Sequence, residues 1–524
     1  MMKRFRRMSK VLVGGMVISI MVGCGANQSA SVTTDRTDYT AAEEYVVDSV
    51  STTESVEMEY NTEEYSTFVE HSFVSAKDEP LSTFSADVDT ASYSNVRRMI
   101  LDGYLPQVDA VKVEEFINYF SYDYEPPTGE EPLGIQTELT ECPWNEDSCL
   151  LAIGISAEDI EVEDLPPSNL VFLIDTSGSM SSEDKLPLVQ EAFSLLVEQL
   201  QPGDRISIVT YAGSTEVILE GATYNQKQEI IDGINSLYAA GSTNGGNAIS
   251  EAYALAEEYF MEGGNNRIIL ATDGDLNVGV TSESDLKELV EAQRDSGIYL
   301  SVLGFGDGNY KDNKLETLSQ NGNGNYYYID SKIEAQKVLV EEMGATLYTV
   351  AQDVKIQVEF NPLLVEGYRL IGYENRTLST SDYVDDTKDA GEIGAGHEVT
   401  ALYEIVLTDS DQIIDSTQLK YQEQTYVDSE ELLTVSVRYK EPGEDASSEI
   451  TTVVTSEMYR TEMSDNMMVA SAVAEFAMLL RESEDKGSAS YEAVLERVRN
   501  SQLFMEDDYV VELYTLVKKA SALN

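Results

Sequence analysis

The fold of the central part of the chain is decided by the segment Leu170-Val171-Phe172-Leu173-Ile174-Asp175-Thr176-Ser177-Gly178-Ser179-Met180. It joins a continuous apolar run to a loop of hydroxyl and carboxylate side chains. Continuous apolar strands are typical of parallel sheets that are buried on both faces. Similar runs, separated by helical patterns, recur at 206–209, 268–271, 299–303 and 326–329. We therefore predict that residues 166–348 form a doubly wound α/β domain with a mostly parallel sheet.

Oxygen-bearing side chains stand where two of these strands are expected to end. Asp175, Ser177 and Ser179 follow the first strand, and Asp273 follows the run at 268–271. Thr243 lies between them, in a glycine-rich loop that opens a helix. Ligands of open parallel sheets bind at the carboxyl ends of strands. Because the set offers oxygen without thiol or imidazole, it predicts a site for a hard divalent cation, Mg²⁺ first, with Mn²⁺ or Ca²⁺ as alternatives.

The order Asp-x-Ser-x-Ser, a downstream Thr and a Thr-Asp-Gly resembles the metal-ion-dependent adhesion site of von Willebrand factor type A domains. The resemblance implies that Ser177, Ser179 and Thr243 contact the metal directly or through water. It implies that Asp175 and Asp273 complete the set, often through water. A metal held mainly by hydroxyls and water stays electropositive and keeps an open position. A Glu or Asp of a partner protein can fill that position, which makes the ion a recognition element.

A wider resemblance covers about residues 80–520. Over this range the chain resembles a bacterial lipoprotein family that has a central von Willebrand factor type A domain and a C-terminal region of no assigned activity. The segments that carry it are 84–93, 113–120, Cys142-Pro143-Trp144, 272–279, Gly394-Ala395-Gly396-His397 and Ala474-Glu475-Phe476. The resemblance implies an architecture but leaves the biological role open.

The regions around the α/β block show other patterns. Apolar and polar residues alternate at 135–139, 354–360 and 433–439, which is typical of antiparallel strands with one wet face. We predict a β-sandwich from 131–165 and 349–460, into which the α/β domain is inserted. Helical spacing predicts an N-terminal helical segment over 81–130, with Thr90 as a cap, and a C-terminal one over 461–524, capped by Asp465.

The N-terminus is read as a targeting segment. A basic head precedes a short apolar run and Gly23-Cys24, which resembles the lipobox of bacterial lipoproteins. Residues 1–23 are then a signal peptide, and Cys24 carries the lipid that holds the protein at the outer face of the cell membrane. An ordinary signal peptide or an uncleaved anchor is the alternative. Residues 24–80 are expected to be an acidic, disordered tether.

Charge and rare residues limit the remaining functions. A formal charge of −61 argues against nucleic-acid binding. The histidines are His71 and His397, too few for histidine-based metal sites, and His397 is expected to be structural. Cys142 and Cys149 flank a predicted hairpin, so they form a disulfide in an exported chain or remain two free thiols.

The sequence is compatible with three functions. The leading hypothesis is a non-enzymatic, lipid-anchored module that binds protein through a metal-bridged carboxylate. The second is an envelope hydrolase that uses the same metal or the acid pair Asp87 and Asp89, although these two acids are more simply helix caps. The third is a structural envelope protein in which the metal only stabilises the domain. Residues 307–312 resemble a calcium loop only briefly and are expected to form a surface turn.

Overall fold

The computed structural model describes residues 63–129, 131–160, 165–242, 247–274, 283–308, 310–417, 425–444 and 446–524. All of them belong to one compact unit, Glu59–Asn524. The predicted signal peptide, Cys24, Thr243 and most of the predicted tether lie outside the described residues.

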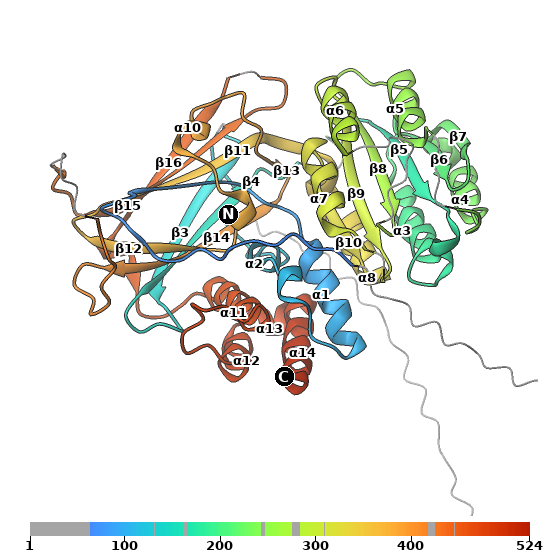
Figure 1. The fold of residues 1–524 in the computed structure, drawn as a ribbon. Helices are drawn as coiled ribbons and strands as arrows, with labels where there is room; N and C mark the ends of the chain where they lie inside the picture. Colours follow the sequence, from blue (N-terminus) through green and yellow to red (C-terminus); the bar gives the residue numbers. More distant parts are fainter. Residues whose placement is uncertain are drawn as a thin grey trace, which may run out of the picture. The chain divides into compact units, whose positions relative to one another are not determined.

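The central block is a doubly wound α/β domain (Figure 1). Its sheet has the strand order β10-β9-β8-β5-β6-β7. The strands are β5 Ser168–Asp175, β6 Arg205–Tyr211, β7 Thr215–Thr223, β8 Asn265–Thr272, β9 Tyr299–Phe305 and β10 Tyr326–Ile329. β7 runs antiparallel to β6 at one edge, and the other neighbours are parallel. The predicted mostly parallel sheet is confirmed.

Helices cover both faces of this sheet. They are α3 Leu186–Gln199, α4 Lys227–Asn235, α5 Ala248–Glu258, α6 Glu283–Arg294, α7 Asp312–Asn321 and α8 Lys332–Gln336. Side chains of α3, α4 and α8 share a hydrophobic core with Phe172, whereas those of α5, α6 and α7 share another core with Val171. Phe172 stacks on Phe193 of α3 with ring centroids 4.1 Å apart. Successive strand residues point to opposite faces, and both faces are covered, which explains why residues 170–174 of β5 are all apolar.

Two further sheets form the β-sandwich. One has the order β1-β12-β14-β4-β3-β17, and the other has β13-β11-β15-β16 with β2 also paired to β11. Their bounds are β1 Val74–Ser75, β2 Leu81–Ser85, β3 Leu133–Glu141, β4 Cys149–Ala157, β11 Thr349–Phe360, β12 Val365–Ile371, β13 Gly391–Gly394, β14 Glu398–Leu407, β15 Glu431–Lys440, β16 Ser448–Thr455 and β17 Tyr459–Arg460. β4 pairs with β14, so strands on both sides of the α/β block meet in one sheet.

The N-terminal part of the unit departs from the expected ranges. β1 lies in the predicted tether and β2 in the predicted helical segment, yet both add to the sandwich. Packing also begins well before residue 81. Glu63 pairs with Arg98 at 3.0 Å and Glu64 with Lys311 at 2.8 Å. The local sequence predicts a tether at these acids because their basic partners are distant in the chain.

A helical layer packs on the first sheet of the sandwich. It contains α1 Ala91–Asp102, α2 Val113–Ile117, α11 Asp465–Leu480, α12 Tyr491–Asn500, α13 Leu503–Glu506 and α14 Asp508–Leu523, and the short helices α9 Met343–Leu347 and α10 Thr380–Tyr383 lie outside it. Phe116, Trp144 and Phe476 share its core. The segments 81–130 and 461–524 therefore meet in space.

Both predicted caps of this layer need correction. Thr90 occupies the N-cap position of α1, but its side chain makes no capping hydrogen bond. Ser464, rather than Asp465, caps α11 by accepting a hydrogen bond from the Met467 backbone N–H. The Asp465 carboxylate instead accepts from the backbone N–H of Gln502 at 2.7 Å. Asp465 therefore joins α11 to the loop before α13.

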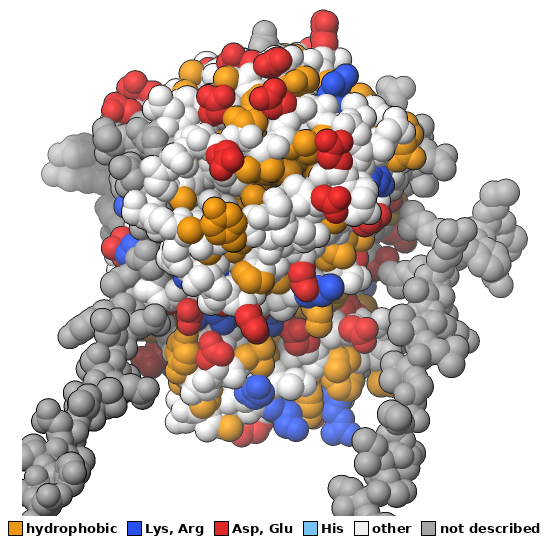
Figure 2. Space-filling view, turned by 90° about the vertical axis from the view of Figure 1, so that its right-hand side faces the viewer, with side chains coloured by type: hydrophobic (Ala, Val, Ile, Leu, Met, Phe, Trp, Pro, Cys, Tyr) orange, Lys and Arg blue, Asp and Glu red, His pale blue; other side chains and the backbone are white. Residues whose placement is uncertain are grey.

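Charge is unevenly distributed on the face shown in Figure 2. Acidic side chains are spread over its upper part, and lysine and arginine side chains gather at its lower end. Among the helices in the described part of the chain, none has both the length and the apolar composition needed to span a bilayer.

Candidate metal site

The site is built at the carboxyl ends of two neighbouring parallel strands. Ile174 of β5 lies opposite Ala271 of β8. Asp175 is therefore aligned with Thr272, and Asp273 is the next residue along. Asp175 is fully buried and Asp273 is 1% exposed. The sheet register thus brings together two carboxylates that are distant in the sequence.

The loop after β5 adds two hydroxyl groups. The backbone N–H of Ser177 donates to Asp175 Oδ1 at 2.8 Å, which turns the chain sharply after the strand. Ser177 Oγ and Ser179 Oγ lie 2.9 Å apart. Ser177 is buried, whereas Ser179 is exposed. The loop therefore holds its hydroxyls side by side, with one of them open to solvent.

The chain that leads to Thr243 passes beside this loop. Ala240 N–H donates to the Thr176 carbonyl at 2.9 Å, and Gly178 N–H donates to the Gly241 carbonyl at 3.1 Å. A Cβ atom on Gly178 would lie 3.2 Å from that carbonyl oxygen, so glycine permits the close approach. Thr243 itself lies outside the described residues, and its role as a ligand stays a prediction.

The donor set fits a hard cation. Asp175 Oδ2 and Asp273 Oδ1 are buried and have no hydrogen-bond partner within the described residues. Burial raises the pKa of Asp175 to about 7, and the nearby Asp273 charge adds to that rise. Buried carboxylate oxygens need a compensating partner. Asp175, Ser177, Ser179 and Asp273 lie together as predicted, and a divalent ion is the partner that their oxygens suit.

One residue of the site escaped the sequence reasoning. Lys185 is 7% exposed, and its Nζ lies 3.0 Å from Asp273 Oδ2. It stands at the N-cap position of α3, ten residues beyond Asp175. Nothing in the local pattern marks it, because a lysine before a helix is ordinarily a solvated surface residue.

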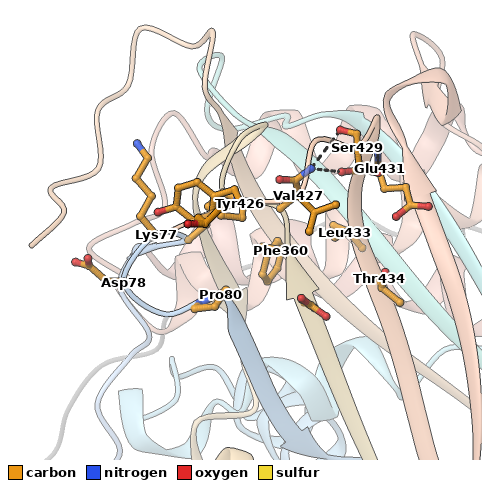
Figure 3. A pocket seen from close by; sticks show the side chains of 15 residues that line it. Lys77, Asp78, Pro80, Phe360, Tyr426, Val427, Ser429, Glu431, Leu433 and Thr434 are labelled. Atoms are coloured by element: carbon orange, nitrogen blue, oxygen red, sulfur yellow. Dashed lines mark hydrogen bonds between the residues drawn. The ribbon is translucent and has the colours of Figure 1, made fainter. Parts of the chain in front are cut away.

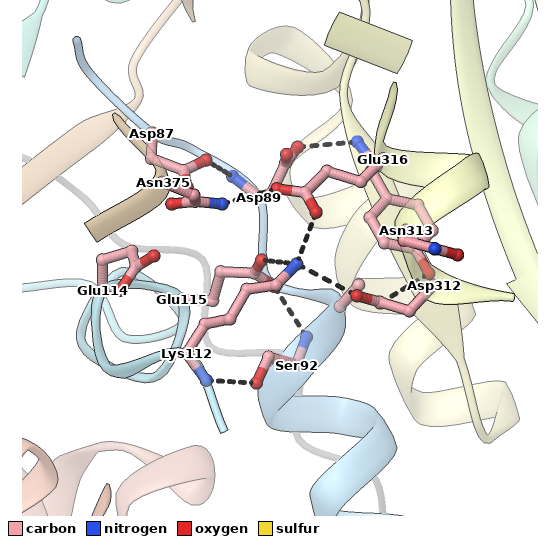
Figure 4. Close-up of polar contacts among 12 residues, drawn as sticks. Asp87, Asp89, Ser92, Lys112, Glu114, Glu115, Asp312, Asn313, Glu316 and Asn375 are labelled. Carbon is pink, nitrogen blue, oxygen red and sulfur yellow. Dashed lines mark hydrogen bonds and ion pairs between the residues drawn. The ribbon is translucent and has the colours of Figure 1, made fainter. Parts of the chain in front are cut away.

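The alternative acid pair has a different environment. Arg376 donates two hydrogen bonds to Asp87, both at 2.8 Å, and one to Asp89 at 2.9 Å. Neither acid caps α1, and the expectation that they do is wrong. They belong to a buried ionic cluster (Figure 4) in which Lys112 contacts Glu115, Asp312 and Glu316. This bidentate contact with Arg376 favours a structural role for Asp87.

His397 also fits a structural role. Burial lowers the pKa of His397 to about 4, so the ring is neutral at ordinary pH. Its backbone carbonyl accepts a hydrogen bond from Ala157 N–H at 2.9 Å, and this contact joins the Gly394–Gly396 turn to the end of β4.

The two internal cysteines are not joined, so the expected disulfide is corrected. Both thiols are free. Cys149 lies opposite Glu141, and Cys142 N–H donates to the Ser148 carbonyl at 3.2 Å. Cys142 packs in the core shared with the helical layer, whereas Cys149 packs against the core inside the sandwich. The thiols therefore occupy opposite faces of the sheet, although the hairpin brings their backbones close.

Two hollows lie away from the candidate metal site. One of about 480 Å³ opens at an end of the sandwich and is lined by Lys77, Asp78, Phe360, Tyr426 and Leu433, among others (Figure 3). Another of about 650 Å³ lies between α6, α7 and the segment 387–392. None of the predicted metal ligands lines either hollow.

Family models cover most of the chain. Residues 169–342 match the von Willebrand factor type A domain, residues 345–523 match the model described as the C-terminal part of the uncharacterized protein YfbK, and residues 59–152 match a model described as von Willebrand factor. The uncharacterized protein YfbK of Escherichia coli strain K12 is 41% identical over 473 residues, which are 88% of this chain and 82% of that protein.

Solved structures show more distant similarity. A von Willebrand factor type A protein from Catenulispora acidiphila is 16% identical, with a TM-score of 0.41 over 75% of this chain and 90% of that one. Proximal thread matrix protein 1 from the mussel byssus, in a structure described as having a zinc-occupied metal-ion-dependent adhesion motif, is 18% identical, with a TM-score of 0.28 over 36% of this chain and 46% of that one.

Proposed function

The chain belongs to the family of the uncharacterized protein YfbK, and on that premise we propose that it is a non-enzymatic module that binds a protein partner through a divalent cation. Mg²⁺ is the first candidate, and Mn²⁺ or Ca²⁺ are alternatives. The ion is held by the site at the carboxyl ends of β5 and β8, in a domain of the von Willebrand factor type A family.

The observation that supports this proposal most directly is the pair of buried oxygens at Asp175 and Asp273. Neither Asp175 Oδ2 nor Asp273 Oδ1 has a hydrogen-bond partner within the described residues. The remaining donors are hydroxyls, which carry no charge to neutralise the ion. The two carboxylates balance the charge of a divalent ion, and uncharged hydroxyl and water ligands leave a coordination position that one more carboxylate can occupy.

The partner is proposed to supply that carboxylate from a Glu or Asp side chain. Ser179 is exposed, so the site is open to solvent on one side. The chain as a whole has a charge of −61, which repels acidic proteins at long range. We therefore expect the partner's acid to project from a neutral or basic surface. A lipid on Cys24 is proposed to hold the module at the outer face of the cell membrane.

The test is metal-dependent binding by two site variants. Asp175→Asn and Thr243→Ala should each weaken Mg²⁺ or Mn²⁺ binding about 10–100-fold, as losses at metal sites typically do. Both variants should keep the parent's circular dichroism, because the sheet is stabilised by its apolar core. Isothermal titration measures the metal, and a membrane crosslinking pull-down with and without chelator measures the partner.

The outcomes separate the three functions. Folded variants that bind metal and partner as the parent does would refute the adhesion site. If metal binding raises the unfolding temperature but the same proteins are captured with and without chelator, a purely structural ion is favoured. Metal-dependent turnover of peptide or ester substrates would favour the hydrolase.

A further inference from the structure

Lys185 brings a buried positive charge into the proposed metal site. The residue is 7% exposed, and Asp273, its partner at 3.0 Å, is 1% exposed. Its backbone N–H donates to the Ser182 carbonyl at 3.1 Å, which ties the loop after β5 to the start of α3. The ammonium group thus approaches the site from the same loop that supplies the serine hydroxyls.

The fold leaves room for this lysine by means of a glycine. Gly306 follows β9 and has a φ of +70°, a conformation that L side chains rarely adopt. A Cβ atom there would lie 2.1 Å from Cε and 2.5 Å from Cγ of Lys185. The Tyr328 hydroxyl donates to the Gly306 carbonyl at 2.6 Å and holds this segment in place. The segment after β9, held by Tyr328 of β10, therefore shapes the path of the Lys185 side chain.

We propose that Lys185 is a resident counter-cation that sets the balance between metal binding and carboxylate binding at this site. The inference rests on the proposed metal-dependent function. Asp175 and Asp273 together contribute two negative charges, and the ammonium offsets one of them. Lys185 therefore repels an incoming divalent ion and attracts the carboxylate of a partner. The consequence is a site with weaker metal affinity and a stronger pull on the carboxylate.

The two effects predict changes of opposite sign in one variant. Lys185→Met keeps an unbranched side chain and removes the charge. The affinity of Lys185→Met for Mn²⁺ should rise about 10-fold. Changes of this size are typical when a residue that contacts a metal ligand, rather than the metal itself, is replaced. The variant's affinity for acetate, measured on the Mn²⁺-loaded protein, should fall at least about threefold. A lysine that only supported the fold would change the two affinities in the same direction or not at all.

The experiment uses the full chain and two probes. Water-proton relaxation measures Mn²⁺ binding, and displacement of metal-bound water measures acetate. Lys185→Arg, which keeps the charge, should stay within about threefold of the parent for both probes. Lys332→Met is a matched control in the same domain, because Lys332 is 61% exposed and pairs with Glu191 at 3.7 Å. Lys185→Gln keeps a polar end near Asp273 and gives a second reading if Lys185→Met fails to fold.

The possible failures are distinguishable. A parent chain that binds no Mn²⁺ would overturn the proposed function and this inference with it. If the parent binds Mn²⁺ but the uncharged Lys185 variants bind it with unchanged or weaker affinity, only the proposed role of Lys185 is overturned. Tighter Mn²⁺ binding with unchanged acetate affinity would also overturn it.

Discussion

At the scale of single residues, protonation of Asp175 should control metal binding. Burial raises the pKa of its carboxyl to about 7 in the metal-free protein. A cation needs the ionised form and must displace a proton below that pH. Apparent Mn²⁺ affinity should therefore be nearly constant above pH 8 and fall about tenfold per pH unit below pH 7. Titrations from pH 5.5 to 8.5 measure this slope.

The control for this effect is the Asp175→Asn variant. It has no carboxyl group to titrate at that position, so its residual Mn²⁺ affinity should vary much less between pH 6 and 8. A parent whose affinity is flat over that interval would contradict the assignment of Asp175 as the controlling group.

At the scale of elements, Lys112 joins two of them through buried charges. It precedes α2, and its Nζ lies 2.9 Å from Glu115, 3.2 Å from Asp312 and 2.9 Å from Glu316, the last two on α7. Lys112→Met leaves these carboxylates without their common cation. Loss of one partner from a buried ion pair costs about 3–5 kcal/mol, so the free energy of unfolding should drop by that amount. Urea denaturation with circular dichroism measures it.

A comparison with an exposed lysine and the pH dependence of the unfolding free energy test whether buried charges cause this loss of stability. Lys287 is 52% exposed and pairs with Glu291 at 3.6 Å, so Lys287→Met should change stability by less than about 1 kcal/mol. In the parent, burial raises the pKa of Glu115 to about 8 although the Lys112 charge lowers it. This carboxyl is therefore largely protonated at pH 7, and the ion pairs lost in Lys112→Met at that pH are those with Asp312 and Glu316. The raised pKa stabilises the folded state below the unfolded value of about 4.3, and this contribution is lost as pH rises through 8. Equal losses for the two lysine variants would contradict a buried ionic link.

At the scale of the whole molecule, attachment to the membrane should depend on Cys24. The chain carries a charge of −61, so anionic lipid repels it rather than holding it. We expect Cys24→Ala to release the protein into the soluble fraction or to block its processing. Membrane fractionation with a high-salt wash measures this release.

Another cysteine provides the control for the anchor. Cys149→Ala removes a half-buried thiol of the sandwich and should leave the protein in the membrane fraction. A Cys24→Ala protein that is processed like the parent and stays with the membranes after the wash would refute lipid attachment at this residue.

The sequence by itself determined the local features of the α/β domain. Residues 170–174 predict a strand buried on both faces because every position is apolar, and the parallel sheet has that strand as β5. Asp175, Ser177 and Ser179 could be assigned to one site because they follow that strand directly. Asp273 could be added because carboxyl ends of parallel strands meet at one edge.

Only the tertiary structure decided features that depend on partners distant in the chain. Glu63 and Glu64 resemble tether residues until Arg98 and Lys311 are seen to pair with them. Cys142 and Cys149 are close in sequence, but alternation along β-strands directs their side chains to opposite faces, so no disulfide forms. Lys185 reaches Asp273 along a path beside Gly306, the residue that follows β9, where the lack of a side chain leaves space. Local patterns specify backbone periodicity, whereas charge pairing and side-chain clearance depend on which segments the fold brings together.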